Sequence, residues 1–165
     1  MGLLLSAPVA RAYREDDHAA CVALFQSNVP EYFAAVEIDD FLQTLQQVDR
    51  YWVIELAGEG IVACGGYDGV DDEPGVAALC WGMVRRDLHR RGLGDFLVRE
   101  RLRRIDADED FNAVVIETTR FSCDFYARYG FVVTREQADG FAPGYDLVEM
   151  RRTVPWPRSS GARGV

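Results

Sequence analysis

The sequence predicts a single-domain mixed α/β fold, with a mostly antiparallel central sheet flanked by helices. Three observations support this. Segments with apolar residues at three- and four-residue steps are interspersed with short β-rich runs. Three of these runs follow one another with only turn residues between them, as in an antiparallel meander. The length of 165 residues suits one domain with a substantial core. We assign residues 1–154 to the domain and expect 155–165, rich in Pro, Ser, Gly and Arg, to be a disordered tail.

The first third of the chain is expected to hold a strand and two helices. The strand is expected near 9–14, after a mobile N-terminus. The acidic run 15–17 is favourable in the first turn of a helix, which we expect to span 16–27. Pro30 ends that part of the chain, and apolar residues at helical spacing over 38–48 predict an amphipathic second helix.

The remaining elements are expected in the order three strands, helix, strand, helix and two strands. The fifth strand, over 113–119, is an uninterrupted apolar run, which is typical of a strand buried on both faces. A hairpin turn at 57–60 and a turn at 70–75 separate the three strands, and the last of them ends at Val84. A helix over 93–105, a strand over 113–119 and a short helix closed by Gly130 follow. The final strand pair flanks the loop 138–144.

Composition excludes several classes of function. All 18 basic residues are arginine, which removes any mechanism that needs lysine, such as a Schiff base, a PLP anchor or a Walker lysine. A net charge of −9 argues against general nucleic-acid binding and is compatible with a cationic substrate. Four scattered cysteines and two histidines show no metal-ligand or disulfide spacing, so we expect reduced thiols, no metal and a cytoplasmic protein. No run approaches the ~18 apolar residues of a membrane span.

The segment 84–105 is a basic exception in this acidic chain. It holds eight arginines and three acidic residues, so it carries +5 while the remainder carries −14. At its centre Arg90-Arg91-Gly92-Leu93-Gly94 joins a strand directly to a helix. Amides at such a helix start lack intrahelical acceptors and, with the helix dipole, form an anion site that glycines leave open. We expect a diphosphate group there, contacted by Arg90 and Arg91. The later arginines are interpreted as a solvated helix face: Arg99, Arg101, Arg103 and Arg104.

Two well-known phosphate-binding motifs do not fit this turn. A P-loop needs a lysine, and a Rossmann turn needs a third glycine where Leu97 stands. The stretch "VRRDLHRRGLGDFLV" instead resembles the acetyl-CoA pyrophosphate loop of the GCN5-related N-acetyltransferases (the GNAT family), whose core is Gln/Arg-x-x-Gly-x-Gly/Ala. "DFYARYGF" resembles that family's later Phe-Tyr-x-x-x-Gly-Phe segment, and the order of elements over 9–152 also matches.

The sequence departs from the family pattern at three positions. His89 stands where Gln or Arg is usual, Arg86 where Pro is common, and Thr119 where Asn is often found. Main-chain amides would make most phosphate contacts, so the first two changes should matter little. The hydroxyl of Thr119 can still bond to the cofactor arm. His89 lies on the phosphate side of the expected site, and we interpret it as structural and not as a base.

The resemblance implies an acetyl-CoA-dependent N-acetyltransferase, in which a primary amine attacks the thioester directly. Backbone amides at the end of the strand before the loop would polarise the thioester carbonyl. Tyr126 would protonate the departing thiolate, since a tyrosine pKa of about 10 is close to that of a thiol. Its neighbour Tyr129 is interpreted as packing. The residues implied to bind the cofactor are Gly82, Met83, Val84, Arg90, Arg91, Gly92, Leu93, Gly94, Asp95 and Thr119.

The general base and the acceptor stay open. Glu117 is the first candidate for the base, with Glu31, Glu37 and a base acting through water as alternatives. The family builds its acceptor walls from the regions 28–40 and 138–146, and the acceptor is a small amine, an amino acid, an antibiotic or a protein N-terminus. We expect no nucleic-acid or membrane partner, and a homodimer remains open. The rival function is a non-catalytic acyl-CoA-binding or regulatory module on the same fold.

Overall fold

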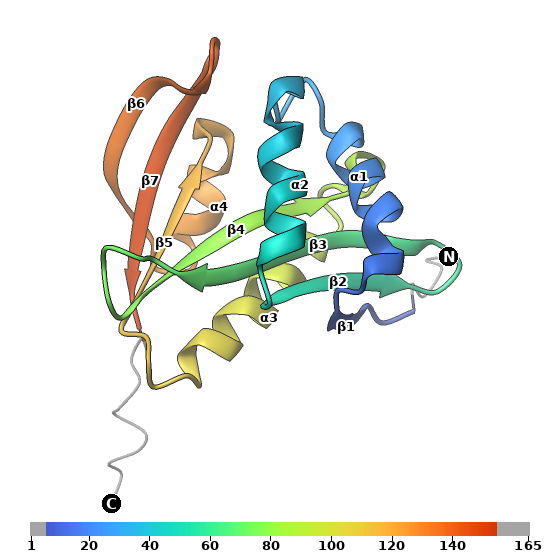
Figure 1. Ribbon diagram of the computed structural model, residues 1–165, viewed down its shortest axis with the longest axis horizontal. Coiled ribbons are helices and arrows are strands. Elements are labelled where there is room, and N and C mark those ends of the chain that lie inside the picture. The colour runs from blue at the N-terminus through green and yellow to red at the C-terminus, as the bar shows by residue number, and fades with distance from the viewer. Residues whose placement is uncertain (1–5, 155–165) are drawn as a thin grey trace, which may run out of the picture. The chain divides into compact units, whose positions relative to one another are not determined.

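The computed structural model describes residues 6–154, and Figure 1 shows its elements. Its seven strands form a sheet in the order β1-β2-β3-β4-β5-β7-β6. Strands β4 and β5 pair in parallel, and the pairs β1–β2, β2–β3, β5–β7 and β6–β7 are antiparallel. This confirms the predicted mixed, mostly antiparallel α/β fold. No helix within residues 6–154 is long and apolar enough to cross a bilayer. The expected mobile start and disordered tail fall on residues 1–5 and 155–165, outside the described range.

The elements lie close to their predicted positions. In chain order they are β1 (Val9–Ala12), α1 (His18–Ser27), α2 (Ile38–Gln47), β2 (Tyr51–Leu56), β3 (Gly60–Gly69), β4 (Val76–Val84), α3 (Leu93–Asp106), β5 (Ala113–Thr118), α4 (Cys123–Ala127), β6 (Val132–Ala142) and β7 (Tyr145–Thr153). Short 3₁₀ turns precede α1, α2 and α4, and another lies between β4 and α3. The acidic run 15–17 forms the first of these turns and not the first turn of α1 itself.

The chain divides into two compact units, and the first comprises the residues up to Gly66 together with Trp81–Arg101. Helices α1 and α2 lie on one side of strands β1–β3, and the start of α3 lies on the other (Figure 1). The apolar core on the α3 side joins β2, β3, the β4–α3 connection and α3. Its buried members are Ile54, Leu56, Val62, Ala63, Leu88, Leu93 and Leu97. This packing fixes the start of α3 against the sheet.

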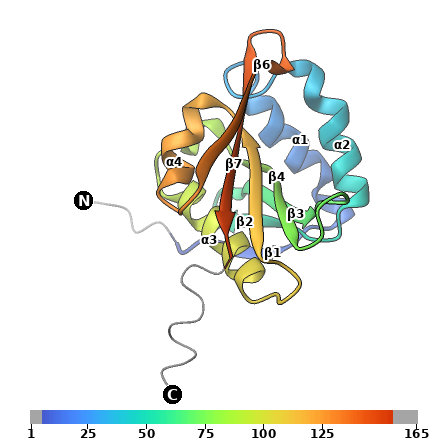
Figure 2. The same ribbon diagram turned by 90° about the vertical axis from the view of Figure 1, so that its left-hand side faces the viewer.

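The second unit comprises Tyr67–Cys80 and the residues from Leu102 onward. Strands β5, β7 and β6 run side by side in it, with α4 beside them (Figure 2). The guanidinium of Arg152 on β7 bonds both carboxylate oxygens of Asp106, at 3.0 and 3.2 Å, and donates to the carbonyl of Tyr129 at 2.9 Å. These bonds connect the end of α3 and the end of α4 to the same strand.

The predicted loop over 138–144 is wrong in its extent. Strand β6 continues to Ala142, and a register shift between Gln137 and Ala142 accommodates the extra residues. Asp139 adopts a left-handed conformation, with φ of 54°. Its amide donates to the Asp146 carboxylate at 2.9 Å, and its own carboxylate accepts from the amide of Gly144 at 2.6 Å. The glycine and proline signals therefore mark a bulged hairpin, because local carboxylate bonds replace part of the strand pairing.

Candidate functional site

The connection from β4 to α3 has the geometry of an anion-binding turn. Arg90 and Gly92 both have positive φ angles, of 63° and 84°. The first α-helical hydrogen bond runs from the amide of Phe96 to the carbonyl of Gly92, at 3.0 Å. The amides of Leu93 and Gly94 therefore lie in the first helical turn, where an α-helix offers no intrahelical acceptor. The 14-residue α3 adds its dipole at this end.

The space outside Gly92 is open. A Cβ built on this glycine would meet no other atom within 4 Å. The left-handed φ disfavours any residue with a side chain, and the open space lets a ligand approach the main chain directly. Both properties suit a phosphate bound by amides at the helix start.

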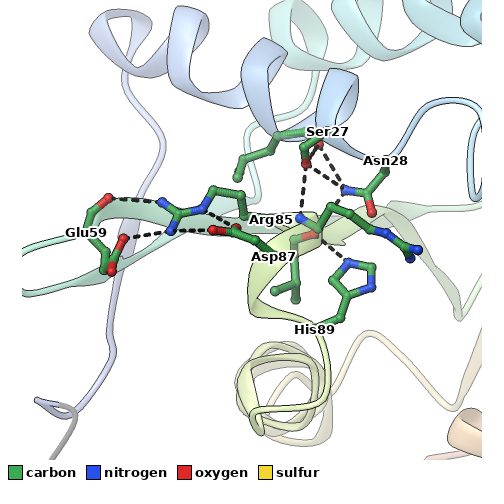
Figure 3. A network of polar contacts seen from close by, with 9 residues as sticks. Ser27, Asn28, Glu59, Arg85, Asp87 and His89 are labelled. Atoms are coloured by element: carbon green, nitrogen blue, oxygen red, sulfur yellow. Dashed lines mark hydrogen bonds and ion pairs between the residues drawn. The ribbon is translucent and has the colours of Figure 1, made fainter. Parts of the chain in front are cut away.

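The guanidinium of Arg85 is paired with two acidic residues. Its guanidinium bonds the carboxylates of Glu59 and Asp87, each at 2.6 Å, as Figure 3 shows. The hydrogen bond to Asp87, followed by that to Glu59, raises the pKa of Arg85. Its amide also donates to the carbonyl of Val62 at 2.8 Å. Arg85 thus connects the β2–β3 turn to the end of β4 and is not available to an anion.

The other arginines of this connection fall into two kinds. Arg86 forms a salt bridge with Glu31, and its guanidinium carbon lies 4.9 Å from the centre of the Tyr32 ring. Arg90 and Arg91 are exposed and form no salt bridge with any residue in the range 6–154. The two arginines that flank the glycine turn are therefore the ones whose charge a bound anion can use.

A groove of about 250 Å³ borders this turn. Its charged walls are Arg91, Arg99 and Asp95, and its apolar walls include Phe96 and Pro8. The groove lies entirely within the first unit and carries two positive charges against one negative charge. It leaves space for a ligand beside the start of α3.

The end of β4 is tied to α1 and to His89, as the close-up in Figure 3 shows. The carbonyl of Val84 accepts from Asn28 Nδ2 at 2.9 Å and lies 2.8 Å from His89 Nε2. The hydroxyl of Ser27 accepts from the amide of Arg86 at 3.2 Å. Both lone pairs of the Val84 carbonyl accept hydrogen bonds, so a ligand would contact the main chain of Val84 through its amide. The contact of His89 is the one expected of a structural histidine.

Sequence reasoning missed two features of β4 and α3. Trp81, inside β4, has a φ of 44°, which is rare for a large side chain. Arg101, interpreted above as solvated, is only 2% exposed, and this part of the prediction is wrong. Arg101 lies four residues after Leu97 and four before Ile105, which are 3% and 0% exposed, so it belongs to the inward face of α3. That spacing, together with the glycine at position 82 within a strand, was the available signal.

The other predicted site residues belong to the second unit. Tyr126 is 8% exposed, and its ring meets those of Phe125 and Phe131 edge-on at 5.0 and 5.7 Å. Glu117 is exposed on β5, opposite Glu149 of β7. Thr119 follows directly after β5, and its carbonyl accepts from the amide of Ser122 at 3.1 Å. The expected donor and base thus share one unit, and the loop and the end of β4 share the other.

The alternative bases differ in their surroundings. Glu31 is paired with Arg86. The buried carboxylate of Glu37 accepts from the amide of Ala34 at 2.8 Å and so closes the turn before α2. Burial raises the pKa of Glu37 above its usual value. No cluster of residues that could hold a metal ion occurs in the described part of the chain.

Fold and site together describe an α/β protein whose turn at the start of α3 has a geometry suited to an anion. The model of the acetyltransferase (GNAT) family matches residues 11–131, well over half of the chain. The chain therefore belongs to the acetyltransferase (GNAT) family, which confirms the resemblance seen in the sequence. A comparison with curated proteins finds no match.

Solved structures of similar fold include several acetyltransferases. Ard1 from Thermoplasma volcanium is 20% identical, with a TM-score of 0.72, over 90% of this chain and 98% of that one. The ribosomal-protein-S18-alanine N-acetyltransferase from Escherichia coli is 17% identical, with a TM-score of 0.70, over 90% and 94%. N-acetylglutamate synthase from Neisseria gonorrhoeae, solved with coenzyme A and L-arginine, is 12% identical, with a TM-score of 0.66, over 90% of this chain and 33% of that one. These likenesses show the fold.

Proposed function

We propose that this protein is an acetyl-CoA-dependent N-acetyltransferase that moves the acetyl group to a primary amine by direct attack on the thioester. The single observation that carries the proposal is the turn at 90–94. There first-turn amides, an open glycine and two arginines that form no salt bridge within residues 6–154 meet at the start of α3. Membership of the acetyltransferase (GNAT) family and the N-acetyltransferases among the similar folds support it.

The coenzyme would be held mainly by the first unit. The amides of Gly92, Leu93, Gly94 and Asp95 would bind the pyrophosphate, with charge from Arg90 and Arg91. Gly82, Met83 and the amide of Val84 would line the acyl arm, and Thr119 would bond to it from the end of β5. An extended arm can pair with a strand as an added edge does, which needs main-chain donors and not particular side chains.

The chemistry needs a neutral attacking amine, a polarised carbonyl and a proton for the departing thiolate. We assign the proton donor to Tyr126, whose ring is held by two aromatic neighbours, and the base to Glu117. Glu37 is the alternative base, because its raised pKa keeps it closer to the range in which a base works. The acceptor is a primary amine, and the surplus of acidic residues favours a cationic one.

The test is thiol release from acetyl-CoA in the presence of a panel of amines: polyamines, amino acids, aminoglycosides and peptides with free N-termini. The proposal predicts acceptor-dependent release. Gly92→Glu should weaken coenzyme binding roughly 100-fold and lower release to match at acetyl-CoA concentrations below saturation. A protein that binds acetyl-CoA through Gly92 but releases no thiol with any amine would be the non-catalytic acyl-CoA-binding module. Release that Gly92→Glu leaves unchanged would show that the site is misplaced.

A further inference from the structure

The carbonyl of Trp81 in β4 is fixed by a buried hydroxyl. Trp81 adopts its left-handed conformation within the strand, and its carbonyl accepts from Tyr51 Oη at 2.7 Å. The indole packs among three rings of the α1–α2 layer, those of Phe25, Phe33 and Phe41, at 6.1, 5.6 and 5.3 Å. A bulky residue keeps such a conformation only where its surroundings impose it, and such residues cluster at functional positions.

This arrangement sets the direction of the next amide. The Trp81–Gly82 peptide is trans, since the described cis bond is Val29–Pro30. In a trans peptide the carbonyl and the following N–H point in opposite directions. The Trp81 carbonyl points toward the buried Tyr51 hydroxyl, so the Gly82 amide points away from it. Tyr51 therefore fixes the direction of a main-chain donor in the segment proposed to line the acyl arm.

A buried positive charge lies directly against Gly82. A Cβ built on Gly82 would lie 2.7, 2.9 and 3.0 Å from Nη2, Nη1 and Cζ of Arg101. The guanidinium, with its two Nη atoms nearest, therefore occupies the space that a side chain at Gly82 would need. Only a residue without a side chain permits this contact, which explains a glycine within the strand.

The charge of Arg101 lacks an acidic partner in residues 6–154. Its one hydrogen bond runs from Nη1 to the carbonyl of Gly66 at 3.4 Å, and its Nε has none. Cys64 lies nearby, with its Sγ 3.3 Å from the Tyr51 hydroxyl oxygen. Burial raises the pKa of the Cys64 thiol well above its usual value, so the thiol stays neutral and does not balance the charge. An unpaired buried guanidinium is costly to the fold, and a gain other than stability is needed to explain it.

We infer that Arg101 and Tyr51 are positioning residues for acyl transfer: the guanidinium behind Gly82 and the hydroxyl on the Trp81 carbonyl orient and strengthen the Gly82 amide as a donor to the acyl carbonyl. The inference rests on the proposed function. Positive charge beside an oriented amide stabilises the negative charge that grows on the carbonyl oxygen during attack, and it does so strongly where water is excluded.

The test removes the Arg101 charge and the Tyr51 hydroxyl separately. Arg101→Met keeps the volume and removes the charge, Arg101→Lys keeps the charge, and Tyr51→Phe removes one hydroxyl. Arg103→Met, at an exposed arginine of the same helix, is the matched control. Four quantities are measured for each variant: the melting temperature, the Kd for acetyl-CoA, kcat with the best amine of the panel, and the carbonyl stretch of bound acetyl-CoA labelled with ¹³C, by infrared difference spectroscopy.

For Arg101→Met we expect a melting temperature at or above that of the wild type, because an unpaired buried charge is gone. The Kd should stay within about threefold, and kcat should fall about tenfold, less than the 10²–10³ that follows loss of a direct donor. The carbonyl stretch should move toward the value of free acetyl-CoA. Tyr51→Phe should change kcat and the stretch in the same direction, and Arg101→Lys should recover part of kcat.

Wild-type kcat and an unchanged carbonyl stretch in Arg101→Met would overturn the inference, and so would a loss of stability with normal turnover of the folded protein. If Arg101→Met does not fold, the same readings on Tyr51→Phe and Arg101→Lys decide. A wild-type protein that binds acetyl-CoA but releases no thiol would refute the proposed enzyme while the infrared comparison still tests the role of Arg101. A wild type that binds no acetyl-CoA would refute both proposals.

Discussion

Substitutions at Gly92 can separate an effect on coenzyme binding from an effect on folding stability. Its φ is +84°, and a Cβ there would meet no atom within 4 Å. Gly58, in the β2–β3 turn, has φ of +81° and equally open space, so it is a matched control. In both positions a substitution by alanine costs only the left-handed backbone strain, about 1 kcal/mol. For a chain of this length that cost lowers the melting temperature by roughly 2–4 °C.

The two substitutions should differ sharply in coenzyme binding. A methyl group at Gly92 would occupy space that we assign to a phosphate, and we expect affinity for coenzyme A to fall about tenfold, or 1.4 kcal/mol. Gly92→Glu adds a negative charge near the phosphates. At about 4 Å and an effective dielectric constant near 20 this costs about 4 kcal/mol, and solvent at this exposed turn lowers the effect to a loss of roughly 100-fold.

Calorimetric titration with coenzyme A, paired with thermal melting, measures both effects on the same preparations. Gly58→Ala and Gly58→Glu should melt lower than the wild type and bind the coenzyme normally. If Gly92→Ala and Gly58→Ala lost the same stability and both kept full affinity, the turn at 90–94 would not be the phosphate site.

Four further variants, one of them a control, test other parts of the account. Asp17→Asn should destabilise the fold by about 2 kcal/mol at neutral pH, since it removes a buried carboxylate bonded to Arg11 at 2.7 and 2.8 Å. The hydrogen bond from Arg11 lowers the pKa of Asp17 in the folded protein, so the stabilisation by this carboxylate is present above the unfolded pKa of about 4 and is lost as the pH falls through the folded pKa. In urea titrations the free energy of unfolding of the wild type should decrease over this acidic range, and that of Asp17→Asn should lack this decrease. Gly66→Ala should cost about 3 kcal/mol or more, because its Cβ would lie 2.2 Å from a backbone oxygen, whereas Gly69→Ala, with its nearest atom at 3.9 Å, should change unfolding free energy by less than about 0.5 kcal/mol. Tyr126→Phe should slow thiol release about 100-fold without changing the Kd for acetyl-CoA, and equal rates would remove Tyr126 from the mechanism.

Much of the fold could be predicted because local patterns agree with tertiary packing. The helical spacing over 38–48 places Phe41 and Leu45, 0% and 6% exposed, against the core, and α2 forms where expected. The glycine turn before α3 could be predicted because it depends on main-chain geometry, which glycine makes visible in a sequence. The extent of the final hairpin could not, because the carboxylates of Asp139 and Asp146 replace strand pairing across the bulge.

The roles of single polar residues on β4 and α3 were the least predictable. Arginine on a surface helix is normally solvated, and the local composition of α3 supported that interpretation for Arg101. Its burial depends on space left by Gly82 on a strand that lies almost twenty positions earlier in the chain. The left-handed Trp81 likewise depends on Tyr51, thirty residues away. Such arrangements arise from non-local contacts that neither propensity nor periodicity encodes.

The most direct measurement is a crystal structure of the protein with coenzyme A. We expect pyrophosphate oxygens about 2.8–3.1 Å from the amide nitrogens of Gly92, Leu93 and Gly94, with Arg90 or Arg91 at the phosphates. Phosphates bound elsewhere on the protein, or a turn at 90–94 covered by the protein's own side chains in the complex, would contradict the account.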